Sequence, residues 1–366
     1  MKRVKVSPKR VKEPGNSVNP SQFRVKVLQN RVNIMSTTIV LMKPPQSFLR
    51  ITIKGVGAMN ERLQLYLDNV EKIRLYFGVD GEKFAKRMAI QLTLRGIRFY
   101  YHDYEEVQKH IKVNTKWYST PRSSIKIGHA YYVQFAKEPE KVVQALKQQS
   151  MLPKPKLANV EDSYIAAIYI KDDEHVQKMN ELKGALAKQP SLKYSTHTLS
   201  QCALLTTRSE SAEELATTYK RYYSRLIDLK WKRGRETYQA AFLLTMGTGT
   251  FDDTTWDKVK ELATIIQTAN SKLEPRHYSV VCLLALAKFE VTEFPALNEI
   301  HDEICKVIKA NPKYENTLLI ATQIYTSNEA FGDLPKYDID FIDMVLQGVD
   351  DGFGGDGGDG GGGGGD

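Results

Sequence analysis

The sequence has 366 residues, a formal net charge of +9 and three cysteines, and 42% of its residues are apolar. This length and apolar content can build a sizeable core, whereas three cysteines are too few for a disulfide-stapled extracellular scaffold. No apolar run reaches the ~20 residues that a bilayer-spanning helix needs, so the sequence predicts no transmembrane segment.

The positive charge is concentrated at the N-terminus. Residues 1–58 hold twelve Lys and Arg side chains against one acid, Glu13, while the other 308 residues hold 40 basic and 42 acidic side chains, a net of −2. Residues 1–58 also lack a sustained apolar period, which predicts a disordered basic leader. The alternative interpretation is a basic arm that binds nucleic acid or an anionic membrane surface.

A later translation start is a further hypothesis for these residues. Lys54-Gly55-Val56 is encoded by AAR-GGN-GTN, a purine-rich pattern that resembles a bacterial ribosome-binding sequence, and Met59 follows shortly after it. We therefore expect natural translation to start at Met59, where the helical pattern begins. N-terminal sequencing of the native protein tests this, because a peptide from within residues 1–58 would contradict it.

An eight-residue apolar block recurs seven times after Met59, with successive starts 37 to 40 residues apart. The blocks begin at Met88, Ile127, Tyr164, Gln201, Gln239, Ser279 and Thr317. Each block is apolar almost all round, and an amphipathic pattern with spacings of three and four follows it. A steady period of this length is typical of stacked helix pairs, so we predict an all-α domain over residues 59–349. Its expected architecture is a curved array, or superhelix, of about seven antiparallel helix pairs.

Local signals mark several helix ends. Ser211 with Glu214, and Thr254 with Asp257, have the spacing of an N-terminal capping box. Lys230 and the following basic residues complement a helix C-terminus, which we expect Gly234 to end. At the C-terminus of the chain, residues 350–366 are eleven glycines, five aspartates and Phe353, which predicts a disordered acidic tail.

The sequence contains no motif of a known catalytic or metal centre. It lacks Cys-x-x-Cys, paired histidines with helical zinc spacing, a nucleophile elbow and a phosphate-binding glycine loop. We therefore predict no catalytic residue, metal or cofactor. Polar residues near the same ends of the block helices could line a concave groove instead. These groove candidates are His129, His197, Glu236, His277 and Asn316.

The segment Lys220–Arg235 is a candidate nucleic-acid site. It carries seven basic residues against Asp228, with aromatic residues between them, a composition that suits phosphate contact and base stacking. The residues assigned to this alternative are Arg225, Lys230, Trp231, Lys232, Arg233 and Arg235. The opposing interpretation places its aromatic side chains in the buried stripe of a helix.

From Met59 to about Val349 the chain resembles an uncharacterised bacterial family catalogued as domain of unknown function 4003. The resemblance rests on Asn69-Val-Glu-Lys-Ile, a Leu-x6-Gln-Pro-x-Leu passage at residues 182–192, a tyrosine-rich helix and Lys-Leu-x3-His-Tyr-Ser at residues 272–279. At residues 189–193 this chain has Gln-Pro-Ser-Leu-Lys where members usually have His-Pro-Phe-Leu-Thr. The resemblance implies a soluble cytoplasmic protein and assigns no activity.

These observations favour a cytoplasmic interaction module that binds a protein segment or another ligand on its concave face. Such arrays present long binding surfaces, and sparse cysteines suit a reducing compartment. The first alternative is an enzyme or small-molecule binder with a polar cluster in the groove. The second is nucleic-acid binding through Lys220–Arg235, which the near-neutral charge of residues 59–366 makes the less favoured reading.

Overall fold

The computed structural model describes residues 56–78, 82–153, 160–188, 199–270, 273–308 and 317–326. All of them lie in the compact unit that spans Ile51–Asp366. Every regular element in these ranges is a helix and none is a strand, which confirms the all-α prediction. The predicted leader and tail fall almost entirely outside the described residues, although α2 begins at Val56, three residues before Met59.

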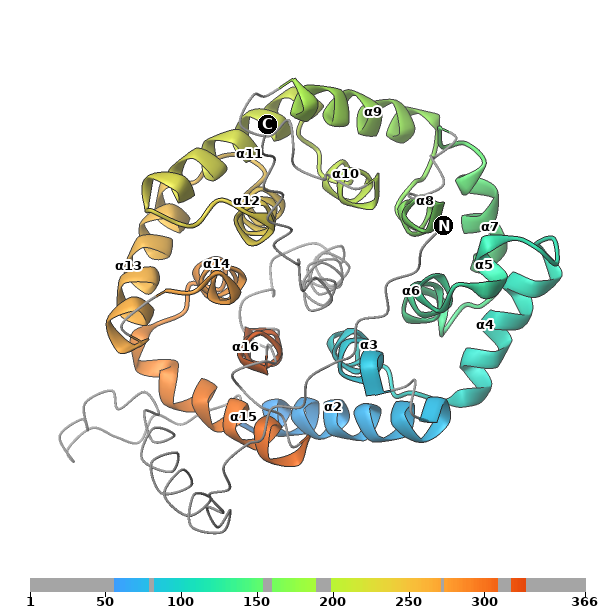
Figure 1. Ribbon diagram of the computed structural model, residues 1–366, viewed down its shortest axis with the longest axis horizontal. Helices are drawn as coiled ribbons and strands as arrows, with labels where there is room; N and C mark the ends of the chain where they lie inside the picture. Colours follow the sequence, from blue (N-terminus) through green and yellow to red (C-terminus); the bar gives the residue numbers. More distant parts are fainter. Residues whose placement is uncertain are drawn as a thin grey trace, which may run out of the picture. The chain divides into compact units, whose positions relative to one another are not determined.

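The apolar blocks form the helices that Figure 1 shows on the inner side of the arrangement. We call these the block helices: α3 (Glu82–Leu94), α6 (Ile125–Phe135), α8 (Val160–Ala167), α10 (Leu199–Leu205), α12 (Arg235–Thr248), α14 (Tyr278–Leu286) and α16 (Thr317–Thr326). Three blocks extend beyond their helices, because α3 ends at Leu94, α8 at Ala167 and α10 at Leu205, each followed by a turn.

The amphipathic segments form the outer helices in Figure 1. These partner helices are α2 (Val56–Phe77), α4 (Tyr101–Val113), α7 (Lys141–Gln149), α9 (Asp173–Ala187), α11 (Ala212–Asp228), α13 (Asp253–Asn270) and α15 (Phe294–Val307). Short helices lie between them: α5 (Thr120–Ser123), η3 (Pro275–His277) and η4 (Val291–Glu293).

Each block helix contacts the partner helix that precedes it, from α2 with α3 to α15 with α16. Block helices also contact one another, as in α3 with α6, α6 with α8, and α12 with α14. In addition α16 contacts both α2 and α3, so the last described helix packs against the first two. An open array would lack these contacts between its two ends.

The two kinds of helix bury different fractions of their surface. Every residue of α14 from Tyr278 to Ala285 is buried, because neighbouring helices cover it on most sides. In α11 the buried stripe includes Leu215, Tyr219 and Tyr222, and the opposite face is exposed. Small residues keep the block helices close: a β-carbon on Gly247 of α12 would collide with the side chain of Leu286 on α14.

Helix ends agree with the sequence signals in one case and differ in two. Ser211 and Glu214 form the predicted capping box on α11, with a Ser211 N–Glu214 Oε2 distance of 2.8 Å. The cap of α13 is Asp252, whose carboxylate accepts from Thr255 N at 2.8 Å, so the predicted Thr254–Asp257 box is wrong.

The prediction that Gly234 ends α11 is also wrong. The helix ends at Asp228, and Lys230 takes the left-handed conformation, with φ +64°. Trp231 N then donates to Leu226 O and Lys230 N to Ile227 O, which is a Schellman motif built on lysine instead of glycine. Gly234 is instead the N-cap residue of α12.

Candidate functional site

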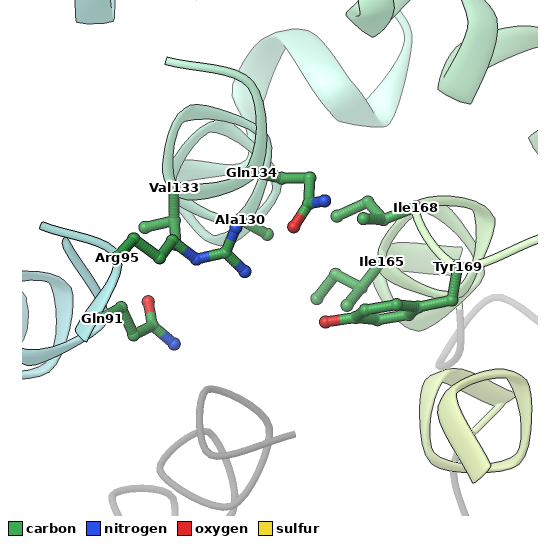
Figure 2. Close-up of a pocket in the computed structure, with 8 residues that line it drawn as sticks. All are labelled: Gln91, Arg95, Ala130, Val133, Gln134, Ile165, Ile168 and Tyr169. Atoms are coloured by element: carbon green, nitrogen blue, oxygen red, sulfur yellow. The ribbon is translucent and has the colours of Figure 1, made fainter. Parts of the chain in front are cut away.

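A small pocket lies between the block helices α3, α6 and α8, near their C-terminal ends. Its lining residues are Gln91, Arg95, Ala130, Val133, Gln134, Ile165, Ile168 and Tyr169. Figure 2 shows that these side chains point toward one another from the three helices. Only about 10 Å³ is enclosed, roughly the space of one water molecule. The pocket can therefore receive one small group of a larger ligand, and not a whole cofactor.

Helix geometry brings the polar lining residues to this end. Arg95 directly follows α3, which a left-handed Gly96 ends through Ile97 N donating to Leu92 O at 2.8 Å. Gln134 lies in the last turn of α6, one turn beyond Ala130. Because α6 packs against both α3 and α8, the three helix ends come together.

The polar groups of the pocket combine donors and acceptors. Arg95 presents a guanidinium, Gln91 and Gln134 present amides, and Tyr169 presents a phenol. The Gln134 Oε1 atom is buried and has no hydrogen-bond partner within the described part of the chain. A buried acceptor of this kind is costly to leave unpaired, so it favours a ligand that brings an N–H or O–H donor. The guanidinium suits a carbonyl or carboxylate acceptor on the same ligand.

The pocket offers little for catalysis. None of its eight lining residues is an Asp, Glu, His, Cys, Ser, Thr or Lys, which supply most nucleophiles and general bases. Tyr169 is its only titratable group with a usual catalytic role. The arrangement is suited to holding a polar group in a fixed orientation.

Two of the predicted groove candidates lie in the core instead. The His129 ring on α6 packs edge-on against Phe77, with ring centroids 5.5 Å apart, and near Tyr104. Burial, with a smaller contribution from Arg87, lowers the pKa of His129 to about 3. His277 ends η3 and is also buried, and burial followed by the charge of Arg276 lowers its pKa to about 4. Both imidazoles are therefore neutral at physiological pH, as packing residues are.

Of the remaining groove candidates, only Glu236 lies in the described residues. Glu236 is half-buried in the first turn of α12. It is near Tyr278, whose pKa is raised mainly by burial and in part by the Glu236 charge. Figure 1 shows α12, the helix of Glu236, across from α6, the helix of His129. His197 and Asn316 lie outside the described residues.

The segment Lys220–Arg235 has exposed charges but no exposed aromatic ring. Trp231 is 4% exposed and stacks on Tyr278 with ring centroids 4.0 Å apart. Tyr222 and Tyr223 are buried in α11. Arg225, Lys230, Lys232 and Arg233 are exposed, and Arg235 is half-buried. The segment can attract phosphates, but it presents no ring on which a base could stack.

The described ranges lack two further features. They hold no group of three or more His, Cys, Asp or Glu side chains arranged to bind a metal ion. None of their helices is both long and apolar enough to cross a bilayer.

Comparison with known proteins identifies the family of the chain. The model of a family described as a protein of unknown function (DUF4003) matches residues 69–339. The chain belongs to the DUF4003 family. No curated protein and no solved structure matches it. The family match covers α3, α6 and α8, so the pocket lies inside the family domain.

The pocket was missed by sequence reasoning, although the repeat held a signal for it. Arg95 and Gln134 are the eighth residues of the first two blocks, and the eighth residues of the next two are also polar, Lys171 and Arg208. In the last three blocks this position is apolar. Equivalent positions of neighbouring block helices lie at the same end of those helices. The polar eighth residues therefore predict a shared polar site at that end.

Proposed function

We propose that this DUF4003 protein is an interaction module that binds a protein segment on the inner side of its block helices. The pocket between α3, α6 and α8 would hold a peptide group of that segment. Its carbonyl would accept from Arg95, and its N–H would donate to Gln134 Oε1. The observation that carries the proposal is the buried, unpartnered Gln134 Oε1 in a pocket that also presents a guanidinium.

The proposed architecture is a repeat of about seven helix pairs that closes on itself. The contacts of α16 with α2 and α3 support closure. The contacts of each block helix with the partner helix that precedes it support the pairing. In such an arrangement the inner helices would form the concave face that a ligand enters. We also propose a cytoplasmic location, because three cysteines in 366 residues are too few for the disulfide framework of an extracellular scaffold.

Display of random peptides on phage tests the binding proposal. We expect enriched peptides whose affinity falls about 10- to 100-fold in Arg95→Leu and Gln134→Leu variants, since each removes a hydrogen bond to a buried partner. Arg225→Leu and Gln144→Leu are matched controls, because both side chains are exposed and outside the pocket. These controls should keep the parental affinity.

The same variants separate this proposal from its alternative. Enriched peptides that bind all four variants equally would show that the pocket is not the peptide site. A small molecule that raises the melting temperature of the parent, but not of the two pocket variants, would instead favour a small-molecule binder. No enrichment above background would contradict the peptide proposal.

A further inference from the structure

The loop after α4 carries aromatic side chains in an unusual place. Trp117 is 80% exposed and Tyr118 is 66% exposed, and their rings are in edge contact with centroids 5.5 Å apart. The other two tryptophans, Trp231 and Trp256, are only 4% and 6% exposed. Exposed large aromatic side chains that lie together often mark a surface that another molecule covers. We call residues 112–126 the Trp117 loop, a connection that includes the last residues of α4, the short helix α5 and the first residues of α6.

Hydrogen bonds hold the loop backbone in one form. The Arg122 guanidinium donates to Lys112 O, and its Nε donates to Thr115 Oγ1 at 3.3 Å. Thr115 Oγ1 itself donates to Ile111 O at 2.6 Å, and Ser119 Oγ to Lys116 O at 2.6 Å. The loop thus presents Trp117 and Tyr118 outward from a fixed backbone. A preformed surface loses less conformational entropy on binding.

The loop is positively charged in a domain that is close to neutral. Residues 107–137 contain no Asp or Glu, and the Trp117 loop holds four basic residues. Lys112 and Lys116 are exposed, and the Lys116 ammonium lies 5.9 Å from the centre of the Tyr118 ring. Lys126 is partly neutralised by Glu161 at 3.9 Å. The partner of this surface should therefore be anionic.

The aliphatic side chains of the loop distinguish between anionic partners. Val113 is 77% exposed and Ile125 is 51% exposed. Base stacking uses aromatic rings and gains nothing from Val or Ile, whereas the interface of a bilayer accepts aliphatic, Trp and Tyr side chains together. Lysines beside them add attraction to anionic headgroups.

We propose that the Trp117 loop docks this protein reversibly on an anionic phospholipid surface. Trp117 and Tyr118 would enter the headgroup region with Val113 and Ile125, while Lys112 and Lys116 would face lipid phosphates. The attachment lies on the surface of the bilayer and does not cross it. It involves none of the pocket residues, so its test does not depend on the outcome of the peptide proposal.

The test uses the full chain and its own fluorescence. Trp117 is the one exposed tryptophan of the three, and all three lie in the described residues, so a shift of emission to shorter wavelength reports burial of this loop. We expect that shift, together with quenching by brominated lipid, on adding vesicles of phosphatidylcholine with phosphatidylglycerol. Vesicles of phosphatidylcholine alone should give neither signal, and high salt should reverse both.

Variants that remove the same charge at different places test which lysines attract the anionic lipid. Lys112→Gln/Lys116→Gln should weaken the fluorescence-reported affinity on the order of tenfold or more, at about 1 kcal/mol for each lysine. Lys230→Gln/Lys232→Gln removes the same charge from exposed positions after α11 and should change that affinity less than about twofold. Arg122 is left in place because it holds the loop backbone.

Four results would overturn the proposal. The first is sedimentation with anionic vesicles without a change in Trp117 emission, which would place the contact elsewhere, such as in basic residues 1–58. The second is equal binding to neutral vesicles. The third is an emission change with a single-stranded oligonucleotide and none with vesicles, which would identify a nucleic-acid surface. The fourth is no binding to anionic vesicles at low salt.

Discussion

The side chain of Asn69 in α2 makes a strong test of how the first helix pair is held together. Asn69 is fully buried and bonds to the connection between α3 and α4. Its Oδ1 accepts from Phe99 N at 2.7 Å, and its Nδ2 donates to Ile97 O at 3.0 Å and to Thr93 Oγ1 at 3.3 Å. One amide therefore satisfies two backbone groups that have left the helical hydrogen-bond pattern.

Replacing Asn69 by alanine should destabilise the protein by about 3 kcal/mol. Each buried backbone group left unpaired costs about 1 to 3 kcal/mol. Because Ile97 is only half-buried, the cost of leaving its carbonyl unpaired should lie near the lower end of this range. A domain of this size loses roughly 2 °C of melting temperature per kcal/mol, so we expect a fall of about 6 °C. Asn69→Asp should cost at least as much, because a carboxylate cannot donate to Ile97 O.

Thermal unfolding followed by circular dichroism measures this effect. Asn180→Ala is the matched control, since Asn180 is exposed on α9 and its removal should change stability by less than about 0.5 kcal/mol. If Asn69→Ala melts within about 1 °C of the parent, the two backbone groups find other partners, and the proposed role of Asn69 is wrong.

Three further predictions concern titration, helix ends and packing. The folded-state pKa values of His129 and His277, about 3 and about 4, lie below the ordinary value of 6.5. The unfolded chain therefore binds more protons below pH 6.5, and stability present above that pH is lost as pH falls toward 4. Urea unfolding between pH 7.5 and 4.5 should show a shallower loss for His129→Gln than for the parent, and an equal slope would refute the assignment. Lys288 has φ +52° at the end of α14, so Lys288→Gly should raise the free energy of unfolding by about 1 kcal/mol, and a decrease in the same urea assay would contradict this. Ala240 is fully buried in α12, so Ala240→Glu should cost several kcal/mol, and an unchanged melting temperature would mean that this position is not in the core.

Much of the fold could be predicted because burial repeats along the chain. A helix covered on most sides must be apolar all round, and α14 shows this directly in Val280–Leu284. The same reasoning failed at helix ends, because the backbone conformation, and not the composition, determines the residue at which a helix stops. Lys230 takes a left-handed conformation that glycine would usually supply, so the glycine signal at Gly234 predicts the end of α11 too late in the chain.

The candidate site could not be predicted in the same way. His129 and His277 are polar and near block helices, which predicts a place in the groove, yet polar residues at such positions can be buried and kept neutral. The order of the blocks predicts that α6 lies between α3 and α8, but it does not predict which side chains of the three helices face one another. Only the contacts between these helices bring Arg95, Gln134 and Tyr169 together.

Arg95, Gln134 and Trp117, which the two binding proposals use, are residues that the repeat does not need for packing. Within the blocks, the core takes the central positions, and Arg95 and Gln134 occupy the eighth position, where the helix is ending and a polar side chain disturbs no packing layer. Outside the blocks, Trp117 lies in a connection between α4 and α5 that contributes nothing to the core. In a protein built this way, sequence changes at block ends and in such connections can alter ligands without altering the fold. Binding differences between members of the family should therefore map to these two kinds of position rather than to the apolar centres of the blocks.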